Sequence, residues 1–330
     1  MKRITITATA VLLALGACGD GNPFFAPETT PVTTTPTTTS NIPADVAGSV
    51  ADVSFDPTAN TLSITGLLRD GNVVTQTYNR NAALDAAAGS GVYQAYTFQD
   101  DPLDEHTTVY VRRLGDVEGS VAVTGGQFQF FSGGVAYKRD GGFDPIVPDA
   151  TNDRGLVTYA GEYIGLSDLN GPNTDLLPVP GGTSPSITPS QAAPVTGDVF
   201  INVEFGSTNV AGTVYNRVID TSALGQVALP DLILAPTNFS TDGSFTGATN
   251  RDDVSGGDSL PVGDYGGIIG GPESNVVTGG LYVEEHFGSD TGTALDTVTG
   301  EEEYGIFVLG RCGSALQDAT ATDCASVDPE

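Results

Sequence analysis

His106 and His286 are the two histidines of this sequence, and His286 lies among residues that could bind a cofactor. Tyr282, Glu284 and His286 occupy alternate positions, so an extended strand would place their side chains on one mixed face. Phenol, carboxylate and imidazole groups can all bind iron, which makes Tyr282 and His286 candidate cofactor-binding residues for iron or haem. The same trio is typical of a solvated strand face, so the spacing alone predicts no cofactor.

Motifs of catalysis do not occur in a suitable context. The sequence has no G-x-S-x-G, no phosphate-binding loop and no dinucleotide fingerprint between a strand and a helix. The two histidines lie far apart, which disfavours a Ser-His-Asp triad or a histidine-rich metal site. Asp100, Asp101, Asp104 and Glu105 precede His106 and could hold a cation, but their spacing departs from the EF-hand pattern. We therefore predict no catalytic residue, no metal and no enzyme.

Cys18 is the first of three cysteines and follows a typical export signal. Lys2 and Arg3 precede an apolar core at residues 4–15, and Leu15-Gly16-Ala17-Cys18 matches a bacterial lipobox. This pattern predicts a lipoprotein signal peptide at residues 1–17 and a lipid on Cys18. An ordinary signal peptide with a chance cysteine is the alternative interpretation.

The residues after Cys18 predict where the protein is held. Gly19 follows the cysteine instead of the aspartate that resembles an inner-membrane retention signal, so we expect the outer membrane. Residues 18–45 are rich in Thr and Pro and predict an extended tether that lifts the folded part off the membrane. We expect the lipid-anchored protein to face the cell surface, and a periplasmic orientation is the alternative.

Cys312 and Cys324 lie near the C-terminus of this predicted exported chain. Export favours oxidation, so we expect a disulfide that closes a loop within a C-terminal tail, residues 313–330. A two-cysteine metal site is the rival interpretation, but no histidine lies near and the spacing is not of the C-x-x-C type.

The charge of the chain is strongly acidic. Twelve Lys and Arg residues against 41 Asp and Glu residues give a formal net charge of −29. This charge repels nucleic acid and anionic headgroups, and it favours cationic partners or divalent ions. A saline habitat would produce the same composition without any ligand, so the charge excludes nucleic acid more firmly than it identifies a partner.

Short strands separated by Gly, Asn, Asp and Pro follow one another from residue 159 to residue 312. In Val199–Phe205 apolar and polar side chains alternate, which predicts one buried face and one wet face. Pro236 lies inside a predicted strand and cannot donate to a ladder, so we expect a bulge, a break or an error in the strand boundary there. The predicted strands are Tyr159–Leu166, Asp198–Phe205, Ala211–Ile219, Leu232–Phe239, Ser244–Thr249, Tyr265–Ile269, Val276–Phe287 and Tyr304–Gly310. Together they predict an eight-stranded antiparallel β-barrel. A membrane-embedded barrel has the same alternation, but the lipobox and the tether disfavour it.

A smaller β domain is predicted at residues 46–140, followed by a linker at residues 141–158. The predicted strands are Ser49–Phe55, Thr61–Ile64, Val73–Tyr78, Tyr93–Phe98, Thr107–Leu114, Gly119–Val123, Gln127–Phe131 and Val135–Lys138, and Arg80–Ala88 is the one predicted helix. The chain as a whole is therefore expected to be all-β, with a small N-terminal β domain before the barrel.

Three further features of the barrel segment are interpreted from their residues. Residues 167–197 form a long Pro- and Gly-rich loop that either contacts a ligand or is a surface excursion. Tyr159 and Tyr163 share a face with glycines, which favours core packing over ligand contact. Glu301, Glu302 and Glu303 are expected in a solvated turn before the last strand.

The glycine and aromatic spacing of the barrel segment resembles a known family. The run Gly263-Asp264-Tyr265-Gly266-Gly267-Ile268-Ile269-Gly270-Gly271-Pro272, with residues 275–282 and 304–307 after it, is similar to the barrel signature of transferrin-binding protein B-like lipoproteins. Residues 210–216 and 239–247 are also similar. The resemblance covers residues 159–312 and implies that residues 46–140 stand where a handle domain precedes the barrel.

The resemblance implies a function of binding. The expected protein is an outer-membrane lipoprotein whose barrel binds a protein or an iron- or haem-related ligand, together with an export or transport partner. The alternative is a periplasm-facing structural or interaction lipoprotein that captures no ligand.

Overall fold

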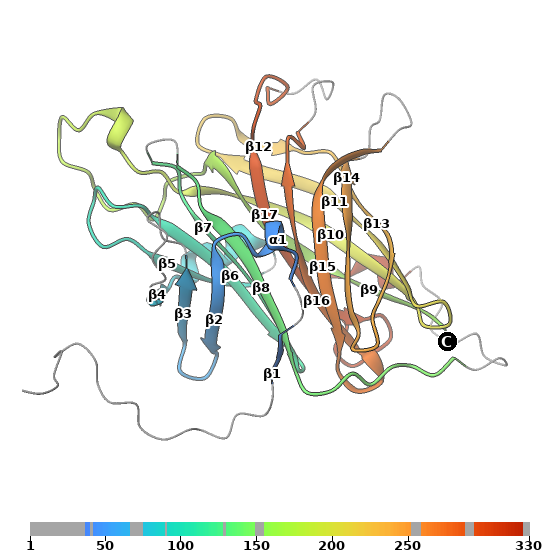
Figure 1. Cartoon of the computed structure of the whole chain (residues 1–330). Coiled ribbons are helices and arrows are strands. Elements are labelled where there is room, and N and C mark those ends of the chain that lie inside the picture. Colours follow the sequence, from blue (N-terminus) through green and yellow to red (C-terminus); the bar gives the residue numbers. More distant parts are fainter. Residues whose placement is uncertain are drawn as a thin grey trace, which may run out of the picture. The chain divides into compact units, whose positions relative to one another are not determined.

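The chain folds into two antiparallel β-sheets, as the predicted all-β class requires (Figure 1). The computed structural model describes residues 37–39 (backbone only), 42–66, 75–89, 91–127, 130–148, 155–251, 259–287 and 294–325. The predicted signal peptide, Cys18 and most of the predicted tether lie outside these residues. Both sheets belong to one unit of the chain, Thr35–Glu330.

The second sheet closes into the predicted eight-stranded barrel. Its strands are β9 (Leu156–Asn170), β10 (Ala192–Glu204), β11 (Asn209–Thr221), β13 (Leu232–Asn238), β14 (Ser244–Arg251), β15 (Leu260–Gly270), β16 (Val276–Glu284) and β17 (Glu302–Arg311). They pair in the order β10-β9-β17-β16-β15-β14-β13-β11, and the pairing of β10 with β11 closes the ring. The additional strand β12 (Gly225–Ala228) pairs with the end of β11. It is short and exposed, so the sequence pattern did not predict it.

Two classes of barrel strand differ in burial. Strands β10 and β11 alternate as predicted, with Val199, Ile201 and Val203 buried inside the barrel and Glu204 exposed. Strand β17 is buried on both faces, because Phe307 points into the barrel core while Ile306 packs outside against the N-terminal sheet. Strands covered on both sides lose the alternating pattern.

The N-terminal sheet contains eight strands in the order β1-β8-β7-β6-β5-β4-β3-β2. They are β1 (Thr37–Thr39), β2 (Val50–Asp56), β3 (Thr61–Gly66), β4 (Thr75–Arg80), β5 (Gln94–Phe98), β6 (Thr107–Leu114), β7 (Val117–Thr124) and β8 (Gly133–Asp140). The predicted strand at Gln127–Phe131 is wrong where it is described, because only an isolated bridge joins Gln127 and Phe130. The predicted helix is a 3-10 helix, η1 (Ala82–Ala88), and a short α1 (Ala44–Ala47) precedes β2.

The segment expected to be tether takes part in the folded unit at its end. Strand β1 pairs with β8, so Thr37–Thr39 join the sheet, and α1 begins at Ala44, within the expected tether. The expected linker also packs on the barrel. Phe143 makes an edge contact with Phe239, and a carboxylate oxygen of Asp144 accepts a hydrogen bond from the Glu273 amide at 2.9 Å. Thus both connecting segments contact structured parts of the chain.

One apolar core lies between the two sheets. It joins Val117, Val121 and Tyr137 of the N-terminal sheet to Ile164 and Val308 on the outside of the barrel. A second core fills the barrel, and a third covers the other face of the N-terminal sheet. The sheets therefore share apolar surface, and burial of that surface stabilises their contact.

Tight packing inside the barrel depends on glycine. Tyr159 and Tyr163 are fully buried, in agreement with the predicted core packing. A β-carbon at Gly305 of the neighbouring strand would lie 1.8 Å from Tyr163 Oη, so only glycine leaves room for that ring. Of the irregularities expected at Pro236, a bulge is the one present, because the pairing of β11 with β13 shifts register between Val210 and Gly212, opposite this part of β13.

Short 3-10 helices occur in the connections: η2 (Pro185–Ile187), η3 (Pro272–Ser274) and η4 (Thr322–Ala325). Within the residues that the structure describes, no helix combines the length and apolar character needed to cross a membrane.

Candidate functional site

The long barrel loop and two loops of the N-terminal sheet meet at one end of the fold. Strands β9 and β10 extend further than predicted, so the loop between them covers residues 171–191. It contacts the β5–β6 loop, residues 99–106, and the segment after β7 at residues 125–127. We call these three segments, with Phe130, the loop platform. Figure 1 shows the long loop beside the loops of the N-terminal sheet.

Two glutamines connect the backbone of the platform loops. Gln99 Oε1 accepts from the Leu177 amide at 2.8 Å, and its Nε2 donates to the Asp104 carbonyl at 3.1 Å. Gln127 Nε2 donates to the carbonyl oxygens of Leu103 at 2.6 Å and Ile187 at 3.0 Å. Each side-chain amide therefore ties together backbone groups that no regular sheet would pair.

His106 and Asp175 form the polar anchor of the platform. Asp175 Oδ2 lies 2.9 Å from His106 Nε2, and Asp175 Oδ1 accepts from Asn81 Nδ2 at 2.7 Å. Burial lowers the pKa of His106, and the hydrogen bond to Asp175 opposes that shift. A neutral ring with its proton on Nε2 fits this geometry, since a carboxylate oxygen accepts. His106 Nδ1 has no hydrogen-bond partner among the described residues.

Close backbone contact completes the platform. The Ser190 amide donates to the Gly126 carbonyl at 3.0 Å, and the Gly125 amide donates to the His106 carbonyl at 2.6 Å. A β-carbon at Gly125 would lie 1.6 Å from the Ser190 carbonyl oxygen, so any other residue would push the loops apart. The interpretation of residues 167–197 as an unattached surface excursion does not fit these contacts.

The platform exposes large apolar side chains although its backbone is fixed. Nine large apolar residues of the described chain are exposed, and five of them lie on the platform with exposed fractions from 36% to 49%. These five are Leu103, Phe130, Leu177, Val179 and Ile187. These exposed apolar side chains make the platform a candidate interaction surface, because their contact with water is unfavourable.

Tyr282 and His286 do not form a joint site. Tyr282 is half-buried, and its ring centroid lies 4.8 Å from that of Tyr304 on the outside of the barrel. His286 is fully buried, so its predicted place on the mixed face is wrong. Strand β16 ends at Glu284 and Glu285 has a φ of +50°, which breaks the alternation and turns His286 inward.

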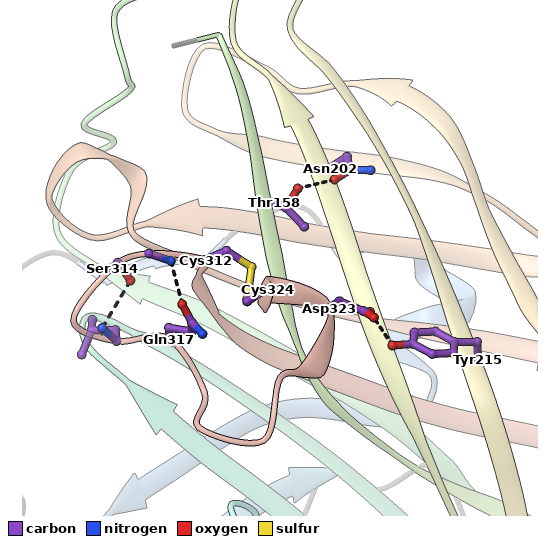
Figure 2. The surroundings of a disulfide bond; sticks show 10 residues. Thr158, Asn202, Tyr215, Cys312, Ser314, Gln317, Asp323 and Cys324 are labelled. Carbon is purple, nitrogen blue, oxygen red and sulfur yellow. Dashed lines mark hydrogen bonds between the residues drawn. A yellow bond between two sulfur atoms is a disulfide. The ribbon is translucent and has the colours of Figure 1, made fainter. Parts of the chain in front are cut away.

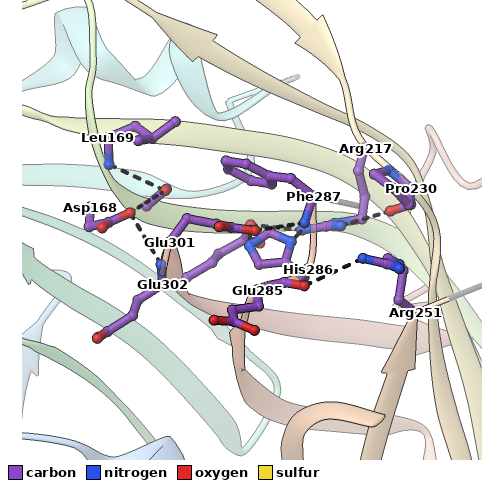
Figure 3. A network of polar contacts seen from close by, with 12 residues as sticks. Asp168, Leu169, Arg217, Pro230, Arg251, Glu285, His286, Phe287, Glu301 and Glu302 are labelled. Carbon is purple, nitrogen blue, oxygen red and sulfur yellow. Dashed lines mark hydrogen bonds and ion pairs between the residues drawn. The ribbon is translucent and has the colours of Figure 1, made fainter. Parts of the chain in front are cut away.

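The predicted solvated turn at Glu301–Glu303 is also wrong, because two of its carboxylates are buried. Glu303 accepts from Arg217 Nη2 at 2.7 Å and from Tyr163 Oη at 2.6 Å, and all three side chains are fully buried. Arg217 Nη2 also lies 3.2 Å from His286 Nδ1 (Figure 3). Glu303 thus completes a buried network with a cation from β11, a tyrosine from β9 and a histidine beyond β16.

The electrostatics of this network follow from its burial. Burial raises the pKa of Glu303, and the charge of Arg217 with the hydrogen bonds from Tyr163 and Arg217 opposes the rise. Burial also lowers the pKa of His286 well below its usual value, and the charges of Arg217 and Arg251 add to this shift. His286 is therefore neutral, with Nδ1 accepting from Arg217.

The buried network fixes connections at this end of the barrel. Arg217 Nη1 donates to the Pro230 carbonyl at 2.7 Å, ahead of β13. Glu301 Oε1 accepts from the Phe287 amide at 2.8 Å, after β16 (Figure 3). Because these charged groups are buried, their hydrogen bonds fix the backbone of these connections from inside the barrel.

The C-terminal loop is closed by the predicted disulfide between Cys312 and Cys324 (Figure 2). Within the loop, Asp318 forms a buried ion pair with Arg112 of β6, and Arg112 Nη1 also donates to the Val308 carbonyl at 2.8 Å. Next to Cys324, the Asp323 carboxylate accepts from Tyr215 of β11. The loop therefore contacts both the N-terminal sheet and the barrel.

Sequence comparisons and structural comparisons gave different outcomes. No protein-family model and no curated protein matches the chain. Among solved structures, it is similar to intact Ap-TbpB, with its N and C lobes, at 12% identity and a TM-score of 0.36. It is also similar to a variant of Transferrin Binding Protein B from Haemophilus parasuis Hp5, at 13% identity and a TM-score of 0.35. A third similar structure is transferrin binding protein B from serogroup B Neisseria meningitidis, at 11% identity and a TM-score of 0.30.

These alignments cover 78% of this chain and 51% to 53% of the solved chains, so the chain spans about half their length. At such identities and TM-scores the likeness does not establish family membership.

Proposed function

We propose that this chain is a lipid-anchored binding module of the outer membrane, which presents the loop platform to a protein ligand. The observation that carries the proposal is the combination of a fixed backbone with five exposed apolar side chains on the platform. A surface that is already ordered loses little conformational entropy on binding, so its apolar burial contributes more fully to affinity.

A protein ligand fits this surface better than iron or haem. The two candidate residues for iron or haem, Tyr282 and His286, lie on opposite sides of the barrel wall, outside and inside respectively. The platform offers apolar contact area and backbone groups, which are typical of protein interfaces. The resemblance of residues 159–312 to transferrin-binding protein B-like lipoproteins supports the same class of ligand.

The lipid anchor in this proposal is inferred from the sequence alone. Cys18 in its lipobox would carry the lipid, and the Thr/Pro-rich residues that follow would connect it to β1. This arrangement would hold the platform at a distance from the membrane, accessible to a large ligand and to an export or transport partner.

Proteinase K digestion of intact cells tests the orientation, with a soluble periplasmic protein as the control for membrane integrity. The proposal predicts that residues 46–330 are removed while the control survives. A Cys18→Ala variant should leave the membrane fraction. Survival of the protein on intact cells, with digestion only after lysis, would contradict surface exposure and favour the periplasm-facing alternative.

A further inference from the structure

The platform carries negative charge beside its apolar side chains. Residues 99–106, 125–127 and 171–191, with Phe130, contain five acidic residues and neither Lys nor Arg. Asp100, Asp101 and Asp104 are exposed and flank the exposed Leu103. Asp175, the acid of the long loop, is already engaged by His106 and Asn81. Asp100, Asp101 and Asp104 therefore place three exposed carboxylates on the same loop as Leu103.

Four cations elsewhere in the described structure form ion pairs with other carboxylates. Arg112 pairs with Asp318, Arg217 with Glu303, and Lys138 with Glu118 at 2.8 Å. Arg113 contacts Asp140 and Glu118. These side chains are occupied away from the platform, so they do not neutralise its carboxylates. The platform thus carries exposed apolar side chains and exposed carboxylates on neighbouring, hydrogen-bonded loops.

We infer that the protein ligand presents apolar side chains bordered by Lys and Arg. The inference rests on the proposed function, because it specifies the partner of the same surface. Attraction between the exposed carboxylates and a cationic partner accelerates encounter and excludes acidic proteins, while apolar contact supplies affinity. Association is therefore sensitive to salt, because these carboxylates are exposed.

Two synthetic amphipathic helical peptides of equal length test the inference, one built of leucine and lysine and the other of leucine and glutamate. Binding is measured to the full chain in its Cys18→Ala form, which carries no lipid. We expect the lysine peptide to bind at least about tenfold more tightly, and its affinity to fall as salt rises from ~0.05 M to ~0.5 M.

Charge variants distinguish the effect of the platform carboxylates from the effect of the chain's overall negative charge. The triple change Asp100→Asn, Asp101→Asn and Asp104→Asn keeps an oxygen acceptor, including the one that accepts from the Leu103 amide at 3.2 Å. It should lower the affinity for the lysine peptide about tenfold and make that affinity less sensitive to salt. The matched control neutralises exposed carboxylates elsewhere, Asp45→Asn, Asp52→Asn and Glu204→Gln, and should change affinity less than about twofold.

A variant that removes exposed apolar side chains tests the proposed function independently of the charge inference. The double change Leu177→Ser and Ile187→Ser should weaken the binding of both peptides. If it does so while the two charge triples have equal effects, the charge inference is wrong and the docking surface stands. If the apolar variant binds both peptides like the unchanged protein, the docking surface itself is wrong.

Discussion

Glu303 and Arg217 form an ion pair inside the barrel, where neither side chain contacts water. Their burial could not be predicted from the run of three glutamates, because the partner cation lies on another strand, far away in the sequence. Arg217 follows Asn216, whose φ of +51° accompanies a register shift between β10 and β11. That irregularity turns Arg217 inward, and strand alternation gives no sign of it.

Removal of one partner of this pair should be costly. Arg217→Met would leave the Glu303 carboxylate buried without its cation, and we expect a loss of about 3–5 kcal/mol in the free energy of unfolding, measured by urea denaturation. Arg217→Met combined with Glu303→Met should recover much of that loss. Arg113→Met, at a partly exposed ion pair, is the matched control and should cost under about 1 kcal/mol. Equal losses at the two arginines would contradict this view of the network.

The burial of His106 is expected to make the stability of the protein depend on pH. Its folded-state pKa lies below the ordinary value, mainly because of burial, so the unfolded chain binds the proton more readily. Stability from this group is present at neutral pH and decreases as pH falls below about 6.5, by at most about 1.4 kcal/mol per pH unit. The stability difference between the unchanged protein and His106→Gln should therefore shrink from pH ~7.5 to pH ~5. A difference that stays constant over this range would contradict the buried, neutral histidine.

Strands and their turns were the elements that the sequence predicted best. Alternation in β10 and the turn residues around it predicted both existence and pairing, because one face is buried and the other is wet. Elements without this contrast between a buried and a wet face were harder to predict. Strand β12 has no buried face, and the segment expected as a strand after Gly126 instead forms part of the platform through Gln127.

The C-terminal disulfide holds a loop that contacts both sheets. Loss of the bond by Cys312→Ser with Cys324→Ser should lower the free energy of unfolding by about 3 kcal/mol, because the reduced chain gains loop entropy when unfolded. Asp318→Asn should destabilise the protein as well, since it weakens the buried pair with Arg112. Thermal unfolding of the variants measures both effects. Unchanged stability in the double serine variant would contradict a structural role for the loop.

At the scale of the whole molecule, the contact between the two sheets was beyond prediction from sequence. The pattern indicated two β-rich segments, but the shared core depends on which outer barrel strands meet β7 and β8. Strand β17 is apolar on both faces for this reason. The loop platform follows from the same contact, because only the packed sheets bring the loop after β9 to His106 and Gln127.

Hydrogen exchange at single-residue resolution tests the central claim, that loops of both sheets form one fixed platform. We predict that the amides of Leu177 and Ser190, which donate to Gln99 and Gly126, exchange at least about tenfold more slowly than in an unstructured chain. Gln127→Ala should speed exchange in residues 99–106 and in residues 171–191 together. Exchange of residues 171–191 at the unstructured rate in the unchanged protein would contradict the platform.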